Sequence, residues 1–241
     1  CYSGNLDLVK YLISLGKFDI NAPNKTLETP MHFAIKSKKL PLVKYLTTLK
    51  DINLKLKNDE NQTYLHVAAD LSEPEAITTF LMSLKKIQLK AKDNEQKTIL
   101  HYACGCNNLS FIKKLTKNEE LNVKDTDEDG RNILHIACES YKADSKIISH
   151  IVSLNKIDIN DKDKNGNTPL LLLCENSNNL AIIKYFVELK GVDLTVVNNE
   201  GETLLHKATS CGEMPLIKYL ISLNKIDQFY MLLVKEEVYN S

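Results

Sequence analysis

Apolar residues recur along this chain in clusters that share one spacing. In the first cluster the apolar residues are Leu8, Val9, Leu12, Ile13 and Leu15. Positions i, i+1, i+4, i+5 and i+7 lie on one face of an α-helix, so the cluster predicts an amphipathic helix with one buried side. The same pattern predicts six further helices, within residues 42–49, 76–84, 111–115, 147–154, 182–189 and 216–223.

The apolar clusters alternate with polar stretches that predict tight loops. Residues 158–167, for example, read Asp-Ile-Asn-Asp-Lys-Asp-Lys-Asn-Gly-Asn. Asn and Asp favour turns because their side chains bond the local backbone, and Gly because it adopts positive φ angles freely. We therefore expect a projecting, hairpin-like loop before each new pair of helices.

Each polar stretch leads into a copy of one hexapeptide, which predicts a second, shorter helix. Residues 29–34 read Thr-Pro-Met-His-Phe-Ala, and copies begin at positions 29, 63, 98, 132, 168 and 203, at steps of 34 to 36 residues. A threonine can cap a helix, and Pro30 and Pro169 suit the first helical position. A period of this size indicates stacked helix pairs that bury apolar surface between neighbouring repeats.

The period also predicts how the chain is divided. We expect one repeat domain over 1–241, made of a partial repeat at 1–23, repeats at about 24–57, 58–92, 93–126, 127–162, 163–197 and 198–227, and a capping helix at 228–241. Cys1 aligns with Cys104, inside a repeat, so we expect the chain to be a piece of a longer protein. The apolar face left open at that end predicts fraying or end-to-end self-association.

These motifs resemble the ankyrin-repeat family. The hexapeptide matches its Thr-Pro-Leu-His-x-Ala signature, the turns at 127–130 and 163–166 match its Asp-x-x-Gly pattern, and Gly4-Asn5 and Gly212-Glu213 match its step between helices. The resemblance runs to about Asp227 and implies an all-α solenoid with projecting loops. The tetratricopeptide family shares the period, but it uses a large aromatic residue and short links, and this chain has no tryptophan.

Some positions depart from the family pattern. Leu27, Asn61 and Gln96 stand where other repeats have the turn glycine, so we expect those loops to be looser or differently turned. In the copy at 168–173, Leu171 replaces the histidine and Leu173 replaces the small alanine. The extra volume predicts slightly separated helices there.

Charge and composition exclude several classes of partner. The chain has 31 basic and 31 acidic residues, and Arg131 is its single arginine. A neutral chain that uses lysine in place of arginine argues against nucleic acid as a partner. We also predict no membrane partner, since no apolar run approaches the ~20 residues that a spanning helix needs.

The histidines and cysteines invite comparison with metal or nucleophile sites. His101-x-x-Cys104-x-Cys106 and His135-x-x-Cys138 have spacings that resemble metal ligands. Packed helices lie ~8 to 10 Å apart, so residues from successive repeats cannot share one metal ion. We therefore expect structural histidines, no cofactor and no catalytic site.

The same spacing exceeds the ~7 Å limit on the Cα separation of a disulfide, so we expect reduced thiols at Cys1, Cys104, Cys138 and Cys174. Free buried thiols favour a reducing compartment, which predicts a cytoplasmic location. Cys106 and Cys211 lie two residues further along their repeats, and we expect them to face outward as the more easily modified thiols.

The resemblance implies that function lies on the concave groove formed by the loop tips and the first helices, where ankyrin repeats bind proteins. Acidic residues outnumber basic ones there, whereas lysines decorate the second helices. This predicts a mildly acidic groove that favours a partner segment with Lys or Arg; the alternative is a solvated surface without preference. The candidate binding residues are Asp59, Glu60, Asp70, Asn94, Glu95, Glu128, Asp129, Arg131, Glu139, Lys164, Asn165 and Glu200.

The sequence thus predicts a non-catalytic interaction module or scaffold. One alternative is a targeting or regulatory arm of a larger enzyme, a ubiquitin-ligase adaptor or a channel. A catalytic fold in its own right is the third class, and it would require activity that depends on Cys106, Cys211 or one histidine.

Overall fold

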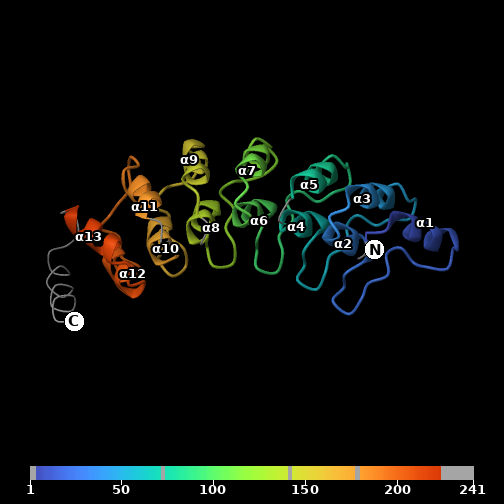
Figure 1. Ribbon diagram of the computed structural model, residues 1–241, viewed down its shortest axis with the longest axis horizontal. Helices are drawn as coiled ribbons and strands as arrows, with labels where there is room; N and C mark the ends of the chain where they lie inside the picture. Colours follow the sequence, from blue (N-terminus) through green and yellow to red (C-terminus); the bar gives the residue numbers. More distant parts are fainter. Residues whose placement is uncertain (1–3, 72–73, 141–142, 177–179, 224–241) are drawn as a thin grey trace. The chain divides into compact units, whose positions relative to one another are not determined.

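The computed structural model describes residues 4–71, 74–140, 143–176 and 180–223, which fold into α-helices joined by loops (Figure 1). The chain divides into two compact units, residues 1–122 and residues 123–241. The predicted capping helix at 228–241 and the end of the last repeat lie outside the described residues.

Unit 1 contains the single helix α1 followed by three helix pairs. Its helices are α1 (Leu6–Ser14), α2 (Pro30–Lys36), α3 (Leu40–Thr47), α4 (Tyr64–Ala69), α5 (Glu75–Met82), α6 (Ile99–Gly105) and α7 (Leu109–Thr116). The short helices α2, α4 and α6 form one layer, and each packs against its partner in a second layer, α3, α5 or α7 (Figure 1).

Unit 2 repeats this arrangement. Its helices are α8 (Ile133–Glu139), α9 (Ser145–Ser153), α10 (Pro169–Asn176), α11 (Leu180–Val187), α12 (Leu204–Ser210) and α13 (Met214–Ser222). The buried positions are the apolar ones of the pattern, such as Ile147, Ile148 and Ile151 in α9. The all-α fold and its helix pairs are therefore confirmed, and the buried positions of neighbouring helices pack against one another.

A side-chain turn closes every loop that leads into a hexapeptide. Asp127 Oδ1 accepts hydrogen bonds from the backbone N–H groups of Asp129 at 3.0 Å and Arg131 at 2.9 Å. The same bond to the residue four positions on is made by Asn24, Asn58, Asp93, Asp163 and Asn198. This local bond is why Asn or Asp occupies that position in each loop.

Neighbouring loop tips are joined by backbone hydrogen bonds within each unit. In unit 1 the Asn94 N–H donates to the Glu60 carbonyl at 3.0 Å, and in unit 2 the Lys164 N–H donates to the Asp129 carbonyl at 2.8 Å. The tips therefore form a fixed edge beside the first helices of each unit.

The expectation of differently turned loops at Leu27, Asn61 and Gln96 is wrong. Their φ angles are 54°, 60° and 59°, in the same left-handed region as the turn glycines of the other loops. Left-handed backbone costs a non-glycine residue about 1–2 kcal/mol. The side-chain turn and the bonds between tips constrain each loop so strongly that this conformation persists without glycine.

In two repeats, at His66 and His135, the histidine of the hexapeptide joins the start of its helix to the following loop. His66 Nδ1 accepts from the Thr63 N–H at 3.2 Å, and His66 Nε2 lies 3.1 Å from the Ala91 carbonyl oxygen. An acceptor at Nδ1 and a carbonyl at Nε2 require the neutral ring with its proton on Nε2. His135 bonds in the same way, with Nε2 3.0 Å from the Asp161 carbonyl oxygen.

The repeat that lacks this histidine is held by apolar packing. Leu171 and Leu173 are both fully buried, and α10 packs closely against both α8 and α12. The separation that we expected at this repeat is therefore not seen, because the leucine side chains fill the space between the helices.

Two turn glycines provide a matched test of packing in the loops. An alanine Cβ at position 166 would lie 2.8 Å from the backbone nitrogen of Asn199, whereas one at position 201 would meet no atom of the described residues within 4 Å. Both glycines have nearly the same positive φ, 77° and 78°. Gly166→Ala should lower the free energy of unfolding by about 1–3 kcal/mol more than Gly201→Ala, as overpacking does. Equal losses in urea titrations would contradict this structure of the loop.

The histidines predict acid sensitivity of the fold. Burial lowers the pKa of His32 and His66 to about 4, against the opposing pull of the Glu28 and Asp93 carboxylates. Since the folded-state pKa lies below the unfolded value of about 6.5, stability is full above pH ~6.5 and falls as the pH drops toward 4.

One repeat already has leucine, Leu171, where the others have histidine. The variant His66→Leu should therefore be accommodated, and it should remove the proton uptake of this histidine on unfolding. Its unfolding free energy should then depend less steeply on pH between about 6.5 and 4.5 than that of the wild type, by up to one proton. Chemical denaturation at several pH values measures both slopes, and identical slopes would show that His66 is not a buried neutral ring.

Candidate functional site

Carboxylates gather on the side of unit 2 formed by the loop tips and the first helices. A pocket of about 490 Å³ lies there, with the aliphatic side chain of Leu172 in its lining. Arg131 and Lys207 are its two cationic residues. Its carboxylates belong to Asp129, Glu139, Asp163, Glu175, Glu200 and Glu202. We call this the unit 2 pocket.

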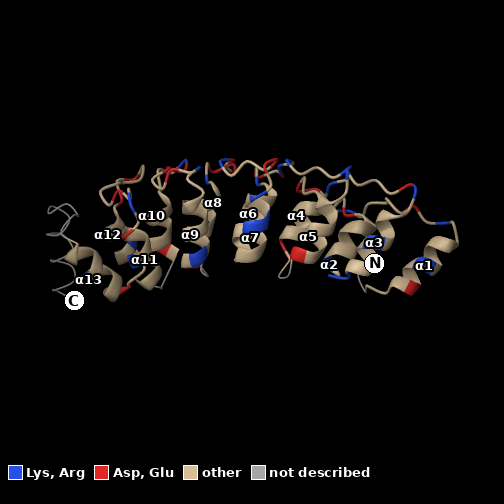
Figure 2. Ribbon diagram, turned by 90° about the horizontal axis from the view of Figure 1, so that it is seen from above, with Lys and Arg blue, Asp and Glu red and all other residues tan. Residues whose placement is uncertain are grey.

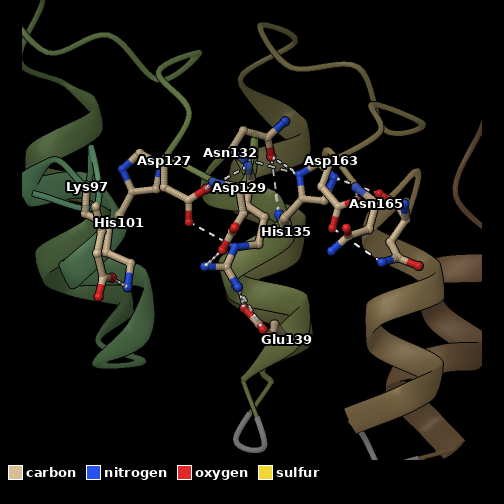
Figure 3. Close-up of polar contacts among 12 residues, drawn as sticks. Lys97, His101, Asp127, Asp129, Asn132, His135, Glu139, Asp163 and Asn165 are labelled. Carbon is tan, nitrogen blue, oxygen red and sulfur yellow. Dashed lines mark hydrogen bonds and ion pairs between the residues drawn. The ribbon is translucent and has the colours of Figure 1, made fainter. Parts of the chain in front are cut away.

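Arg131 is held inside the wall of the unit 2 pocket by three carboxylates. Its guanidinium bonds Asp127 at 2.9 Å and Asp129 at 2.8 Å. A third contact, to Glu139 at 3.0 Å, links the loop tip to α8 (Figure 3). The Arg131 side chain is only 19% exposed, so this cation serves the loop more than it faces a partner.

Lys207 occupies the other side of the unit 2 pocket. Its ammonium lies 2.7 Å from Glu202 in its own repeat and 3.3 Å from Glu175 in the preceding repeat. The Lys207 side chain is 10% exposed. The carboxylates of this groove therefore accept an ammonium group whose side chain is largely buried.

Unit 1 has an equivalent pocket of about 360 Å³, which we call the unit 1 pocket. Its carboxylates belong to Glu28, Asp59, Glu60 and Asp70, and its charged lining includes one cation, Lys36. Unit 1 as a whole contains 18 lysines against 13 acidic residues. The acidity of this pocket is thus a property of the groove and not of the unit's composition. Figure 2 shows charges of both signs along the loops.

The structure brings eight of the predicted binding residues into these two pockets. Asp59, Glu60 and Asp70 line the unit 1 pocket. The unit 2 pocket is lined by Asp129, Arg131, Glu139, Asn165 and Glu200.

The other four predicted residues lie at the tips but line neither pocket. Asn94 and Lys164 donate their backbone N–H groups to the neighbouring tips, and Glu95 pairs with Lys97. Glu128 is an exposed tip residue. Three of these four positions therefore serve the loops themselves.

Sequence reasoning missed the position directly after the histidine. Val67 in unit 1 and Leu172 in unit 2 occupy it, and both line the pockets, as does Lys207 at the same position of α12. The signal was available in the period, because these residues share one place in the hexapeptide. They give the acidic groove a partly apolar lining.

Cys106 and Cys211 are more exposed than Cys104, Cys138 and Cys174, as expected, but they are half-buried and do not face fully outward. Cys106 Sγ lies 2.9 Å from the Ala69 carbonyl oxygen, and Cys211 Sγ lies 2.7 Å from that of Glu175. Burial, together with Asp70, raises the pKa of Cys106 to about 11, and burial also raises the pKa of Cys211. Both thiols bond the preceding repeat, which disfavours the reactive thiolate.

The remaining thiols and imidazoles belong to the packed interior. Cys104, Cys138 and Cys174 are buried free thiols, whereas Cys1 lies outside the described residues. Within the described ranges, no group of three or more His, Cys, Asp or Glu side chains is placed to hold a metal ion. None of the described helices combines the length and the apolar character needed to cross a membrane.

Lysines on the second helices lie over aromatic rings of the next repeat. Lys10 lies 5.6 Å from the ring centre of Tyr45, and Lys184 lies 5.0 Å from that of Tyr219. Such cation–π contacts stabilise by about 0.5–1 kcal/mol at exposed sites. The basic outer face therefore joins neighbouring repeats and is not merely a solvated charge layer.

The chain is similar to longer proteins over part of their length. It is 31% identical over 119 residues to the human SMC5-SMC6 complex localization factor protein 1, covering 49% of this chain and 10% of that protein. It is 39% identical over 74 residues to the NAD-dependent deacetylase sir2B of Dictyostelium discoideum, covering 27% and 10%. The chain thus spans about a tenth of these relatives.

A solved structure and a family model cover much more of the chain. One chain in the structure of the Bd0816 predatory endopeptidase from Bdellovibrio bacteriovorus in complex with immunity protein Bd3460 aligns with a TM-score of 0.68 and 26% identity, over 83% of this chain and 99% of that one. The family model for ankyrin repeats in three copies matches residues 1–93, 77–163 and 140–229. The chain therefore belongs to the ankyrin-repeat family, whose repeats indicate a protein-interaction module.

Proposed function

We propose that this chain is a non-catalytic module that binds a protein partner along the groove side of its units. The observation that carries the proposal is the pair of acidic, partly apolar pockets on the loop tips and first helices. A rigid wall of bonded tips supports binding, because a preformed surface loses little conformational entropy when a partner docks. The excess of carboxylates favours a partner segment with Lys or Arg.

A role as one arm of a larger protein is the second candidate. It is supported by the chain's likeness to about a tenth of a localization factor and of a deacetylase. In such a protein the groove would bring partners to another domain. The full-length sequence separates this role from that of a free-standing module.

We propose a cytoplasmic location because the cysteines of the described residues form no disulfide. Five cysteines in the described ranges are free, and three of them are buried between helices. A reducing compartment keeps such thiols unoxidised.

The groove can be tested with a photo-crosslinking residue placed at two positions of unit 2. Asn165 lies exposed at a tip that lines the pocket, and Lys218 lies exposed on α13. A partner captured by the purified protein should crosslink to position 165 and not to position 218. Its dissociation constant should rise roughly threefold or more between about 50 and about 300 mM salt, because exposed charges are screened. Crosslinks confined to position 218 would place binding on the second helices and refute the proposal.

We also propose that the exposed face of α1 associates with a second copy of this chain. Leu8, Tyr11 and Leu12 in α1, and Leu15 and Phe18 after it, are 36–63% exposed. In the other repeats the corresponding apolar face packs against neighbouring helices.

Light scattering at protein concentrations of about 100 µM tests this association. The wild type should form dimers, and Tyr11→Glu should shift it toward monomer because a charge would have to be buried. Lys50→Glu, at an exposed residue after α3, is the control and should leave the mass unchanged. A wild type that stays monomeric would contradict the proposal.

A further inference from the structure

The two pockets differ in whether a lysine of the chain itself is paired with carboxylates from two neighbouring repeats. In the unit 2 pocket, Lys207 stands directly after the histidine of α12 and lies between Glu175 and Glu202. Glu175 occupies the fourth position after Leu171 in its repeat, where it faces the next repeat. This chain therefore contains one lysine that is already bound by groove carboxylates.

In unit 1 the equivalent positions hold a carboxylate without that lysine. Asp70 is the fourth residue after His66, as Glu175 is after Leu171. In the next repeat the position of Lys207 is taken by Tyr102, whose hydroxyl donates to Asp93 at 2.6 Å and accepts from Gln62 at 2.8 Å. Tyr102 thus contributes no positive charge to the groove.

Two lysines that act on Asp70 electrostatically are each paired with another carboxylate. Lys36 pairs with Glu28, and Lys97 pairs with Glu95. Burial raises the pKa of Asp70, although Lys97 and Lys36 lower it. No ion pair joins Asp59, Glu60 or Asp70 to another residue in the described part of the chain.

We infer that the unit 1 pocket receives one Lys or Arg side chain of the partner, in the role that Lys207 plays in the unit 2 pocket. The aliphatic stem would lie on Val67 and Leu71, and the charged end would reach Asp70, with Asp59 and Glu60 at the rim. Long cationic side chains bury their stems on apolar surface in this way. The pocket, about 360 Å³, is within the size range of ligand sites. This inference rests on the proposed groove function and specifies which pocket selects the partner.

A phage-displayed library of random peptides of about 12 residues, selected on the full chain, provides the probe. Peptides enriched by the wild type should share one Lys or Arg. Asp70→Asn should weaken a selected peptide roughly tenfold or more, since hydrogen bonds to charged groups contribute more than neutral ones. Asp51→Asn makes the same charge change in unit 1 at an exposed residue that does not line the pocket and should have little effect.

Two further variants make the test specific. Tyr102→Lys places an ammonium where Lys207 has one, and it should abolish selection for the basic residue while thermal unfolding verifies the fold. Replacing the selected peptide lysine by methionine should weaken binding to the wild type but add no further loss to Asp70→Asn, the signature of a direct contact.

Enriched peptides without a shared basic residue, or equal losses from Asp70→Asn and Asp51→Asn, would overturn the inference. The groove function would survive that result if those peptides still crosslinked to position 165. Crosslinking only to position 218 would instead refute the groove function itself. A selection that enriches no peptide would overturn the inference that the unit 1 pocket binds a Lys or Arg of a short segment.

Discussion

In two repeats, the histidine of the hexapeptide bonds two backbone segments that lie far apart in the sequence. In His66 and His135, Nδ1 accepts a hydrogen bond at the start of its own helix, and Nε2 meets a carbonyl of the following loop. Only a neutral ring can make both contacts, because one nitrogen must accept and the other must donate. These two contacts fix the position of the loop relative to the helix. The tips of these loops form one side of the groove.

The scaffold uses most of the chain's chemically versatile side chains. The histidines cap helices, Asn or Asp closes each loop, and Cys106 and Cys211 bond carbonyls of the preceding repeat. These groups recur because the repeat needs them. What varies from one repeat to the next is the groove lining, and that variation is what can distinguish one partner from another.

The two pockets show how such variation changes a binding surface. In unit 2 the chain places Arg131 and Lys207 among the carboxylates, which reduces the charge left for a partner. In unit 1 Tyr102 stands where Lys207 would be, and Asp70 forms no ion pair within the described residues. The residue at this one position of the hexapeptide thus decides whether a lysine of the chain pairs with the carboxylate of the preceding repeat.

The sequence alone determined the helix pairs, the loops between them and the side of the repeat on which the candidate binding residues lie, because these follow from local periodicity and capping. The tertiary structure decided the rest. Leu27 and Gln96 adopt the glycine turn because bonds from neighbouring loops hold them there, and Cys106 and Cys211 are half-buried because the preceding repeat covers them. Which charges remain available in the groove depends on contacts such as Lys207 with Glu175, 32 residues apart, which no local pattern encodes.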